Sequence, residues 1–359
     1  EPSPLSQKLD RILVKDRLYE LSHGQTNQNS PRRVPEPFAK EVEEAQTAHL
    51  AAYFEADPAA NKEQAESLGT RAAEKALQAH SVQGSRRENE DAFRHVRVNV
   101  PGRQGRGTLL MVADGHLGRR QAGAQTAFFA VNQFPLYFQQ ALREVQGEAH
   151  PPEAAMRLAI RRMGEDMRIF YAGATFVASY VPDDEDFAYI GVVGDATAHV
   201  LNAGGVGIYT SPEHHFAKLP EAARQAKLEE LSRRYGVQLT FDGGRVKDNE
   251  GHDLPIYKAV GDREYRWVEW EPDVARVPME RGGFLVLASD GAQISHPVQL
   301  SAIRDGESAH TLAQNGTQIT GDNSTVMRLK HAGARADGTG RQVQAARGGS
   351  SESARPASV

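Results

Sequence analysis

Short apolar segments that end at an acidic residue beside glycine recur along this chain. The run LLMVA (109–113) leads directly into Asp114 and Gly115, and the run FLVLAS leads into Asp290 and Gly291. Apolar runs of this length between turn residues are typical of strands that are buried on both faces. We therefore expect buried β-structure in which carboxylates follow the ends of strands.

Other segments predict that these strands belong to a mixed domain of helices and strands. Alternating or continuous apolar residues indicate strands, and apolar residues at helical spacing indicate helices. A proline at the start of the segment 152–171 is typical of the first turn of a helix. We expect strands over 92–100, 108–113, 174–181, 187–194, 197–205, 282–291 and 324–330, and helices over 121–145, 152–171 and 220–235.

The two ends of the chain differ in composition from its middle. Residues 1–79 begin with a polar, proline-containing stretch and continue with Ala, Glu and Leu at helical spacing, so we expect an N-terminal arm and a helical extension. Residues 331–359 are mostly Gly, Ser, Ala and Arg and are predicted to form a disordered tail. Because the first residue is Glu1, we expect a processed or truncated product in which a leader peptide would not be visible.

Composition argues against several classes of protein. The 359 residues include 42 Lys+Arg and 47 Asp+Glu, a formal net charge of -5, and no basic stripe suggests a nucleic-acid partner. Cysteine is absent, which excludes disulfides, thiolate zinc sites and cysteine nucleophiles. No apolar run approaches the roughly 18 residues of a membrane helix. We expect a cytoplasmic and/or nuclear protein, and secretion after removal of a leader stays open.

Carboxylates lie at the ends of several predicted strands. The acidic residues at these ends are Glu90, Asp91, Asp114, Asp195, Asp290 and Asp322. A single Asp-Gly pair is usually an ordinary turn, but burial of many uncompensated carboxylates in one place is costly. Hard divalent cations with oxygen ligands would offset that negative charge. The pattern therefore predicts that the acids act as metal ligands.

Seven segments resemble, in the right order, the motifs of the metal-dependent protein phosphatases (PPM family), the type 2C serine/threonine phosphatases. The resemblance covers roughly residues 80–330. It implies an α+β fold, with a central β-sandwich of two antiparallel sheets flanked by helices on both faces. The matching segments are RRENEDAF (86–93), VADGHLG (112–118), GATFVA (173–178), VVGDATAHVL (192–201), YKAVGDREY (257–265), FLVLASDGAQI (284–294) and GDNSTVMRL (321–329).

The same resemblance implies roles for individual residues. Arg86 corresponds to the arginine that binds the substrate phosphate, and His116 to the histidine that protonates the leaving group. Two Mg²⁺ or Mn²⁺ ions would share a bridging water or hydroxide that attacks phosphorus directly. The implied metal ligands are Asp114, Asp290 and Asp322, the carbonyl of Gly115, and Glu90 and Asp91 either directly or through water.

The sequence departs from the family pattern at several positions. Leu117 replaces a glycine after the histidine, and Ala174 replaces Ser or Thr. Thr197 replaces an arginine, so we expect the loss of a surface salt bridge. Ile294 stands where family members have an aspartate that, with the position of Asp195, helps to bind a third ion. We therefore expect no third metal site, although Asp195 could hold a ligand water.

Residues 211–256 correspond to the flap subdomain, which lies beside the active site in the family. This segment contains His214, His215 and His252. Their spacing fits no standard zinc pattern, so we interpret them as polar residues of the flap rather than as metal ligands.

The leading functional hypothesis is a Mg²⁺/Mn²⁺-dependent phosphatase of phosphoserine and phosphothreonine, acting as a monomer on phosphoprotein substrates. One alternative is a pseudophosphatase with feeble catalysis that serves as a binding or regulatory module; Leu117 and Ile294 favour it. Another alternative is a different two-metal phosphoesterase, such as a nuclease, which the acidic balance disfavours.

Overall fold

The computed structural model describes residues 77–99, 106–116 and 122–333. These residues all belong to one compact unit that spans positions 76–359. The predicted arm and helical extension (1–79) and the predicted tail (331–359) lie outside the described residues, except for three residues of each at its inner boundary. Leu117 also lies outside them.

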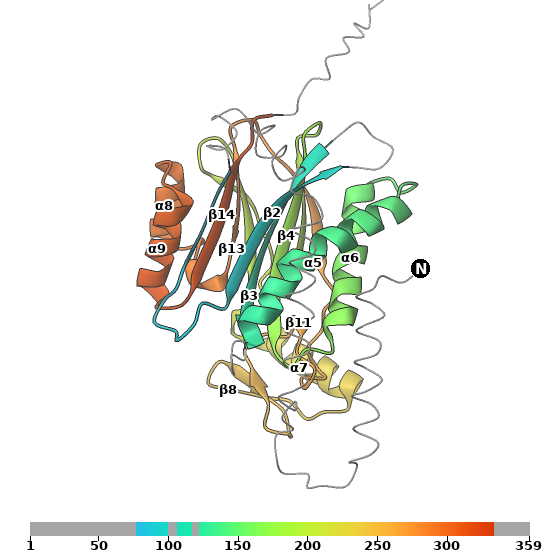
Figure 1. Ribbon diagram of the computed structural model, residues 1–359. Helices are drawn as coiled ribbons and strands as arrows, with labels where there is room; N and C mark the ends of the chain where they lie inside the picture. Colours follow the sequence, from blue (N-terminus) through green and yellow to red (C-terminus); the bar gives the residue numbers. More distant parts are fainter. Residues whose placement is uncertain (1–76, 100–105, 117–121, 334–359) are drawn as a thin grey trace, which may run out of the picture. The chain divides into compact units, whose positions relative to one another are not determined.

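Two antiparallel sheets face each other at the centre of the fold (Figure 1). The first sheet contains β2 (Asp91–Asn99), β3 (Arg106–His116), β4 (Gly173–Pro182), β5 (Phe187–Val193), β11 (Val260–Gly261) and β12 (Asp273–Pro278). The second contains β1 (Leu77–Val82), β6 (Thr197–Leu201), β7 (Gly207–Thr210), β13 (Phe284–Ala288) and β14 (Ser324–Lys330). The order is β12-β5-β4-β3-β2 in the first sheet, with β11 paired to β4, and β1-β14-β13-β6-β7 in the second. The predicted β-sandwich is confirmed.

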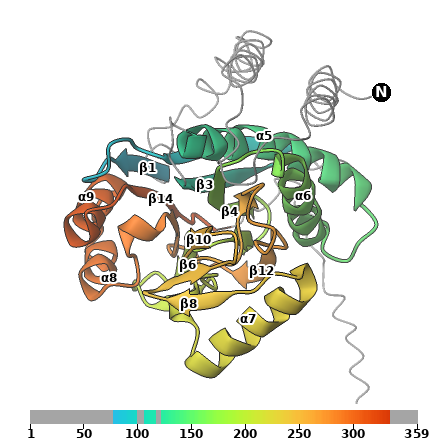
Figure 2. The ribbon, with the colours of Figure 1, turned by 90° about the horizontal axis from the view of Figure 1, so that it is seen from below.

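Two pairs of helices cover the outer faces of the sandwich (Figures 1 and 2). The helices α5 (Ala122–Glu144) and α6 (Pro151–Met167) pack on the first sheet, and α8 (Pro297–Arg304) and α9 (Ala309–Thr320) pack on the second. The fold therefore has the four layers that the resemblance implied. Helix α6 ends at Met167, before the predicted boundary at 171. Beyond it, the carbonyls of Phe170 and Ala172 accept hydrogen bonds from the N–H groups of Arg263 and Asp262.

The apolar run of β3 is explained by burial on both faces. Alternate residues of a strand point to opposite sides of the sheet. Leu110 lies between the two sheets with Leu285 and Leu287 of β13. Leu109 and Met111 face the opposite way, into the cluster under α5 and α6. A strand with two apolar faces gives the continuous hydrophobic run seen in the sequence.

A flap subdomain (residues 211–256) lies at one end of the sandwich, at the bottom of Figure 1. It contains η1 (Phe216–Lys218), α7 (Glu221–Tyr235), β8 (Thr240–Asp242), β9 (Arg245–Lys247) and β10 (Asp253–Leu254). Its own small core packs against Trp267, which is fully buried. Helix α7 ends at Gly236, whose φ of 66° is the left-handed conformation that favours glycine at a helix end. The predicted helix over 220–235 is confirmed.

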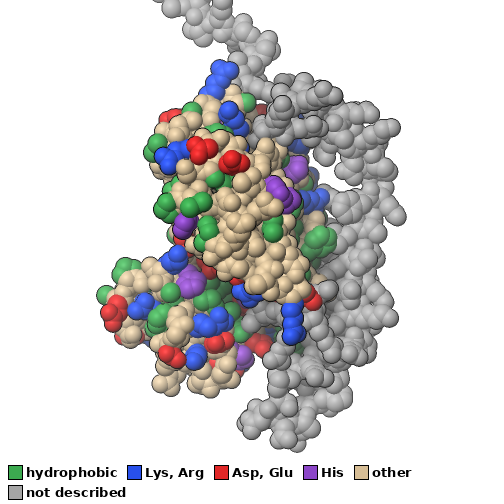
Figure 3. Space-filling view, turned by 90° about the vertical axis from the view of Figure 1, so that its left-hand side faces the viewer, with side chains coloured by type: hydrophobic (Ala, Val, Ile, Leu, Met, Phe, Trp, Pro, Cys, Tyr) green, Lys and Arg blue, Asp and Glu red, His purple; other side chains and the backbone are tan. Residues whose placement is uncertain are grey.

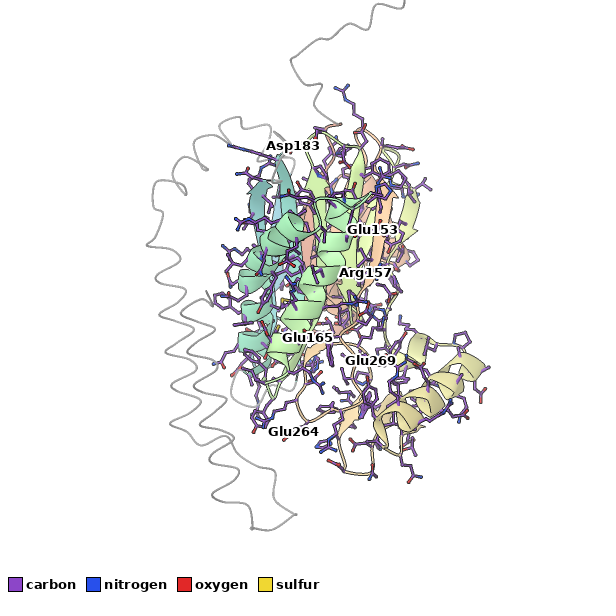
Figure 4. The ribbon with its side chains drawn as sticks, turned by 90° about the vertical axis from the view of Figure 1, so that its right-hand side faces the viewer. Glu153, Arg157, Glu165, Asp183, Glu264 and Glu269 are labelled. Carbon is purple, nitrogen blue, oxygen red and sulfur yellow. The ribbon has the colours of Figure 1, made fainter. Side chains whose placement is uncertain are left out.

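Glu269 joins the flap subdomain to the rest of the domain (Figure 4). Its carboxylate pairs with Lys227 of α7 at 3.1 Å and with Arg234 of the same helix. Glu269 is buried, and a buried carboxylate without cationic partners would be costly. The pairs therefore fix α7 against the segment that leads into β12.

Charged side chains of both signs are scattered over the face that carries α8 and α9 (Figure 3). No gathering of lysine and arginine is visible on that face, in keeping with the mild net charge of the chain. Within the part of the chain that the structure describes, no helix has the length and apolar character needed to cross a membrane.

Candidate active site

The predicted metal ligands meet at the end of the sandwich next to the flap subdomain. Asp91 begins β2 and lies directly opposite Asp114, near the end of β3. Asp290 follows β13 in the short 3-10 helix η2 (Asp290–Ala292), and Asp322 lies two residues before β14. Because neighbouring strands run antiparallel, the end of β3 meets the start of β2, and the end of β13 meets the start of β14. Both sheets thus place carboxylates at the same end of the sandwich.

Six carboxylates form a group that we call the acid cluster: Glu90, Asp91, Asp114, Asp195, Asp290 and Asp322. Burial and the neighbouring charges raise the pKa values of Asp91, Asp114 and Asp195. Burial is the largest effect on Asp114, and the charges of Asp91 and Asp290 add to it, so the pKa of Asp114 lies well above its usual value. Burial also raises the pKa of Asp91 to about 6 and that of Asp195 to about 8, and Asp290 adds to both.

Two oxygens of the acid cluster are buried and have no hydrogen-bond partner in the part of the chain that the structure describes. They are Oε1 of Glu90 and Oδ1 of Asp91. A buried carboxylate oxygen is expected to have a donor or a cation as its partner, because leaving it unsatisfied costs free energy. Closely packed acids with raised pKa values and orphaned oxygens fit hard divalent cations. Among the described residues, however, no three His, Asp or Glu side chains stand in an arrangement that could hold an ion without adjustment.

Glycines let the backbone segments around the acid cluster approach closely. The N–H of Gly115 donates to the carbonyl of Glu90 at 3.1 Å. A Cβ atom at Gly115 would overlap the carbonyl of Gly123, and a Cβ at Gly123 would overlap Oε1 of Glu90. The glycine after Asp114 is therefore required by packing as well as by the turn.

Ser289 holds Asp91 in place, a contact that sequence analysis did not predict. Its hydroxyl donates to Oδ2 of Asp91 at 2.8 Å and accepts from the N–H of Thr325 at 3.0 Å. Ser289 thus connects the end of β13 with β14 and with β2 of the opposite sheet. The only sequence signal was its place directly before Asp290.

Arg86 lies at the exposed rim of the acid cluster. Its Nη2 donates to Oδ2 of Asp322 at 2.6 Å, and 60% of its side chain is exposed. The loop before β2 is fixed by Asn323, whose side-chain amide donates to the carbonyl of Glu88 at 3.0 Å and accepts from the N–H of Gly84 at 3.2 Å. The hydrogen bond that Arg86 donates to Asp322 is the main cause that raises the pKa of Arg86, and the charges of neighbouring acids add to it. An exposed guanidinium is suited to bind phosphate.

His116 is the last residue of β3 and pairs with a carboxylate that sequence analysis missed. Its Nε2 lies 2.8 Å from Oδ2 of Asp262, whose side chain is fully buried. Burial opposes the charged imidazolium, but the charge and hydrogen bond of Asp262, with Asp195 and Glu90, outweigh it and raise the pKa of His116. The signal that could have found Asp262 is the Gly-Asp pair in YKAVGDREY, which repeats the pattern of the other acids.

The turn that carries Asp195 is held by His214, which lies near the start of the flap subdomain. The N–H of Gly194 donates to Nδ1 of His214 at 3.0 Å, and Nε2 of His214 contacts Asp273. His214 therefore fixes the turn between β5 and β6, on which Asp195 lies. His252 bonds to Asp248 at 3.0 Å within the flap subdomain. These two histidines have protein partners, as expected for structural residues of the flap.

Three of the departures from the family pattern are buried in the domain: Ala174, Thr197 and Ile294. Ile294 has 2% of its surface exposed and packs in the apolar cluster under α8 and α9, so it supplies no oxygen to the site. We expect the loss of a surface salt bridge at Thr197, and the structure buries this residue. The hydroxyl of Thr197 lies 3.1 Å from Nε2 of His199, which is two residues further along β6 on the same face of the sheet.

Comparison with known proteins identifies the class to which this fold and site belong. The model of the family Protein phosphatase 2C matches residues 75–292. The chain therefore belongs to the protein phosphatase 2C family, and the predicted resemblance is confirmed. No curated protein sequence matches the chain.

Solved structures share this fold at low sequence identity. A serine-threonine phosphatase 2C from Toxoplasma gondii has a TM-score of 0.53 and 17% identity, over 71% of this chain and 94% of that one. A bacterial serine phosphatase with a point substitution has a TM-score of 0.52 and 21% identity, over 72% and 99%. A sex-determining protein of C. elegans has a TM-score of 0.54 and 18% identity, over 71% of this chain and only 64% of that one.

Proposed function

We propose that this protein is a metal-dependent protein serine/threonine phosphatase that hydrolyses phosphoserine and phosphothreonine by direct attack of water. The observation that carries the proposal is the acid cluster, in which buried carboxylate oxygens of Glu90 and Asp91 have no hydrogen-bond partner among the described residues. A bound cation would compensate the negative charge of such a group. Membership of the protein phosphatase 2C family supports the same reading.

The chemistry of the acid cluster fits two Mg²⁺ or Mn²⁺ ions. The residues that would hold them are Glu90, Asp91, Asp114, Asp290, Asp322 and the carbonyl of Gly115. When bound, such ions supply positive charge to the phosphate and make water acidic enough to attack near neutral pH. We propose no third ion, because Ile294 is apolar and buried.

Arg86 would bind the phosphate of the substrate. Its planar guanidinium can donate two hydrogen bonds to phosphate oxygens at once. Its single ion pair with Asp322 is made at the exposed rim, so a phosphoserine or phosphothreonine side chain can reach the guanidinium from solvent. The substrate would thus be oriented with its phosphorus over the acid cluster.

His116 would protonate the departing oxygen. The alkoxide of serine or threonine is a poor leaving group, so a proton donor accelerates its departure by about 10²–10⁴-fold. The imidazole lies at the end of β3, two residues after Asp114, and its pairing with Asp262 favours the protonated form. The substrates would be phosphoproteins, and we propose that a monomer acts on them.

A pseudophosphatase is the second candidate. It is favoured by Ile294, and by the finding that the described side chains do not form a ready-made set of three metal ligands. In that case the fold would act as a binding or regulatory module, with feeble turnover.

Phosphatase assays separate these two candidates. The protein would be incubated with p-nitrophenyl phosphate and with a phosphothreonine peptide, first with Mn²⁺ and then with a chelator. We expect turnover of both substrates that the chelator abolishes, and near-complete loss of turnover in Asp114→Asn and Asp290→Asn. Turnover that survives the chelator would reject the metal mechanism. No turnover with Mn²⁺ or Mg²⁺ would favour the pseudophosphatase.

A further inference from the structure

The structure sets one buried carboxylate against the imidazole of His116. Nε2 of His116 lies 2.8 Å from Oδ2 of Asp262, whose side chain has 0% of its surface exposed. The second oxygen, Oδ1 of Asp262, is also buried and has no hydrogen-bond partner among the described residues. The hydrogen bond to His116 is therefore the main compensation for burial of this carboxylate.

A glycine between the two residues makes their contact possible. His116 of β3 pairs with Gly173 of β4, and Gly173 pairs on its other side with Gly261 of β11. Neighbouring strands lie about 4.8 Å apart, so the residue after Gly261 must reach across β4 to meet His116. A Cβ atom at Gly173 would overlap the carboxyl group of Asp262. The missing side chain at Gly173 leaves the space through which Asp262 reaches the imidazole.

The backbone at Asp262 adopts an uncommon conformation in making this contact. Asp262 has a φ of 56°, in the left-handed region that non-glycine residues rarely occupy, and it follows Gly261 with a φ of 92°. The N–H of Asp262 donates to the carbonyl of Ala172 at 3.3 Å, and the N–H of Arg263 donates to the carbonyl of Phe170 at 2.9 Å. Unfavourable conformations of this kind persist where the surrounding structure fixes them, and they cluster at functional sites.

We propose that Asp262 is a positioning residue that holds the ring of His116 with Nε2–H toward the carboxylate, so that Nδ1–H is the proton donor to the leaving oxygen. The inference rests on the proposed phosphatase function. A carboxylate that orients a histidine and stabilises its charged form is a known device of acid–base catalysis. Since Asp262 occupies Nε2, the transferable proton must be the one on Nδ1.

The step that this arrangement serves is balanced in atoms and charge. The oxygen of water forms a bond to phosphorus as the bond between phosphorus and the seryl or threonyl oxygen breaks. The electron pair of the broken bond goes to the departing oxygen, which takes the proton from Nδ1 of His116. The proton lost by the water passes to solvent, and His116 remains neutral with Nε2–H still bonded to Asp262.

Kinetics of Asp262→Asn on two leaving groups test the proposal. Asparagine tolerates the left-handed backbone, so the loop should keep its shape. We expect kcat on a phosphothreonine peptide to fall about 10–100-fold, while kcat on p-nitrophenyl phosphate, whose leaving group needs little protonation, falls less than about 3-fold. KM should be unchanged for both. In a His116→Ala background the Asp262→Asn change should add no further loss, since the two residues act as one unit.

A second His–Asp pair supplies the matched control. Nε2 of His331 lies 2.7 Å from Oδ1 of Asp186. Asp186 precedes β5, whereas Asp195 follows it, so this pair lies at the opposite end of the sandwich. Asp186→Asn should leave kcat on both substrates unchanged. Equal losses on the two substrates in Asp262→Asn, with an active wild-type enzyme, would overturn the positioning role and leave the proposed function standing.

Nitrogen-15 NMR of the histidine side chains tests the same contact without turnover. In the wild-type protein Nε2 of His116 should carry a proton, and Asp262→Asn should shift its resonance while His331 is unaffected. Asp186→Asn should do the reverse. A His116 resonance that Asp262→Asn leaves unchanged would overturn the inference, even if the wild-type protein hydrolyses neither substrate and the proposed function fails.

Discussion

Asp91 and Asp114 lie directly opposite each other in the ladder between β2 and β3. Like charges at such a position destabilise a sheet, and burial raises the pKa of both residues. Backbone pairing along the rest of β2 and β3 and the burial of β3 fix the register, so the repulsion cannot be relieved by a shift of the pairing. A bound cation would relieve it, which links metal binding to the stability of the sandwich.

The melting temperature of the protein should therefore rise when Mn²⁺ is added. At a Mn²⁺ concentration about 100-fold above its dissociation constant, the free energy of unfolding should rise by roughly 2.7 kcal/mol. Asp91→Asn should be up to about 1 kcal/mol more stable than the wild type in chelator, because the repulsion is lost, and should gain less from Mn²⁺. Unchanged melting temperatures on addition of Mn²⁺ would contradict the link.

Ser289 should contribute to stability and to the placement of Asp91. Ser289→Ala removes the donor to Asp91 and the acceptor for the Thr325 N–H, and leaving buried groups unsatisfied costs about 1–3 kcal/mol. The control is Ser179→Ala: Ser179 is also buried in a strand, but its hydroxyl has no partner among the described residues. Urea unfolding should show a clear loss for Ser289→Ala and almost none for Ser179→Ala. Equal effects of the two substitutions would reject this role.

Arg86 should affect binding of the phosphate and not the stability of the fold. Its side chain is mostly exposed, so Arg86→Ala should change the free energy of unfolding by less than about 0.5 kcal/mol. We expect kcat/KM on a phosphothreonine peptide to fall at least about 10-fold, since charge-assisted hydrogen bonds to phosphate are strong. Arg86→Lys should restore little, because an ammonium group cannot donate two parallel hydrogen bonds. Full activity of Arg86→Lys would show that charge alone is sufficient.

His199 should make stability depend on pH. Burial lowers the pKa of His199 to about 4, below the usual 6.5, and its ring lies between the hydroxyls of Thr197 and Thr210. Between these two values the unfolded chain binds a proton that the folded protein does not, so the free energy of unfolding must fall as the pH drops from about 6.5 to 4. The expected loss is on the order of 3 kcal/mol. Urea unfolding of the wild type and of His199→Gln between pH 6.5 and 4 measures this loss. If the free energy of unfolding changed with pH in the same way in both proteins, the assigned role of His199 would be wrong.

Seven strands of the sandwich could be predicted, because each of them has an apolar pattern that depends on its own residues alone, whereas β1, β7, β11 and β12 were not predicted. The run in β3 is apolar on both faces, and α6 begins with proline, so both elements were expected from local sequence. The meeting of Asp114 with Asp290 followed from the resemblance to a family and not from spacing, since more than 170 residues separate them. The structure brings the two acids together because β3 and β13 face each other across the sandwich core.

Partners that belong to other segments could not be predicted. Asp262 reaches His116 only because Gly173 has no side chain and β11 pairs with β4, and neither fact is visible in a local pattern. Thr197 replaces an arginine of the family pattern, and its burial comes from the neighbouring His199 ring and the β6–β13 pairing, which enclose it. In both cases the surroundings of the residue are set by contacts with other segments of the folded chain.

The most direct measurement is a crystal structure with Mn²⁺, in which anomalous scattering from manganese counts and locates the ions. We expect two ions among Glu90, Asp91, Asp114, Asp290, Asp322 and the Gly115 carbonyl, and none beside Ile294. A map with no anomalous peak among these residues, at a Mn²⁺ concentration that supports turnover, would contradict the proposal that the acid cluster holds the metal ions.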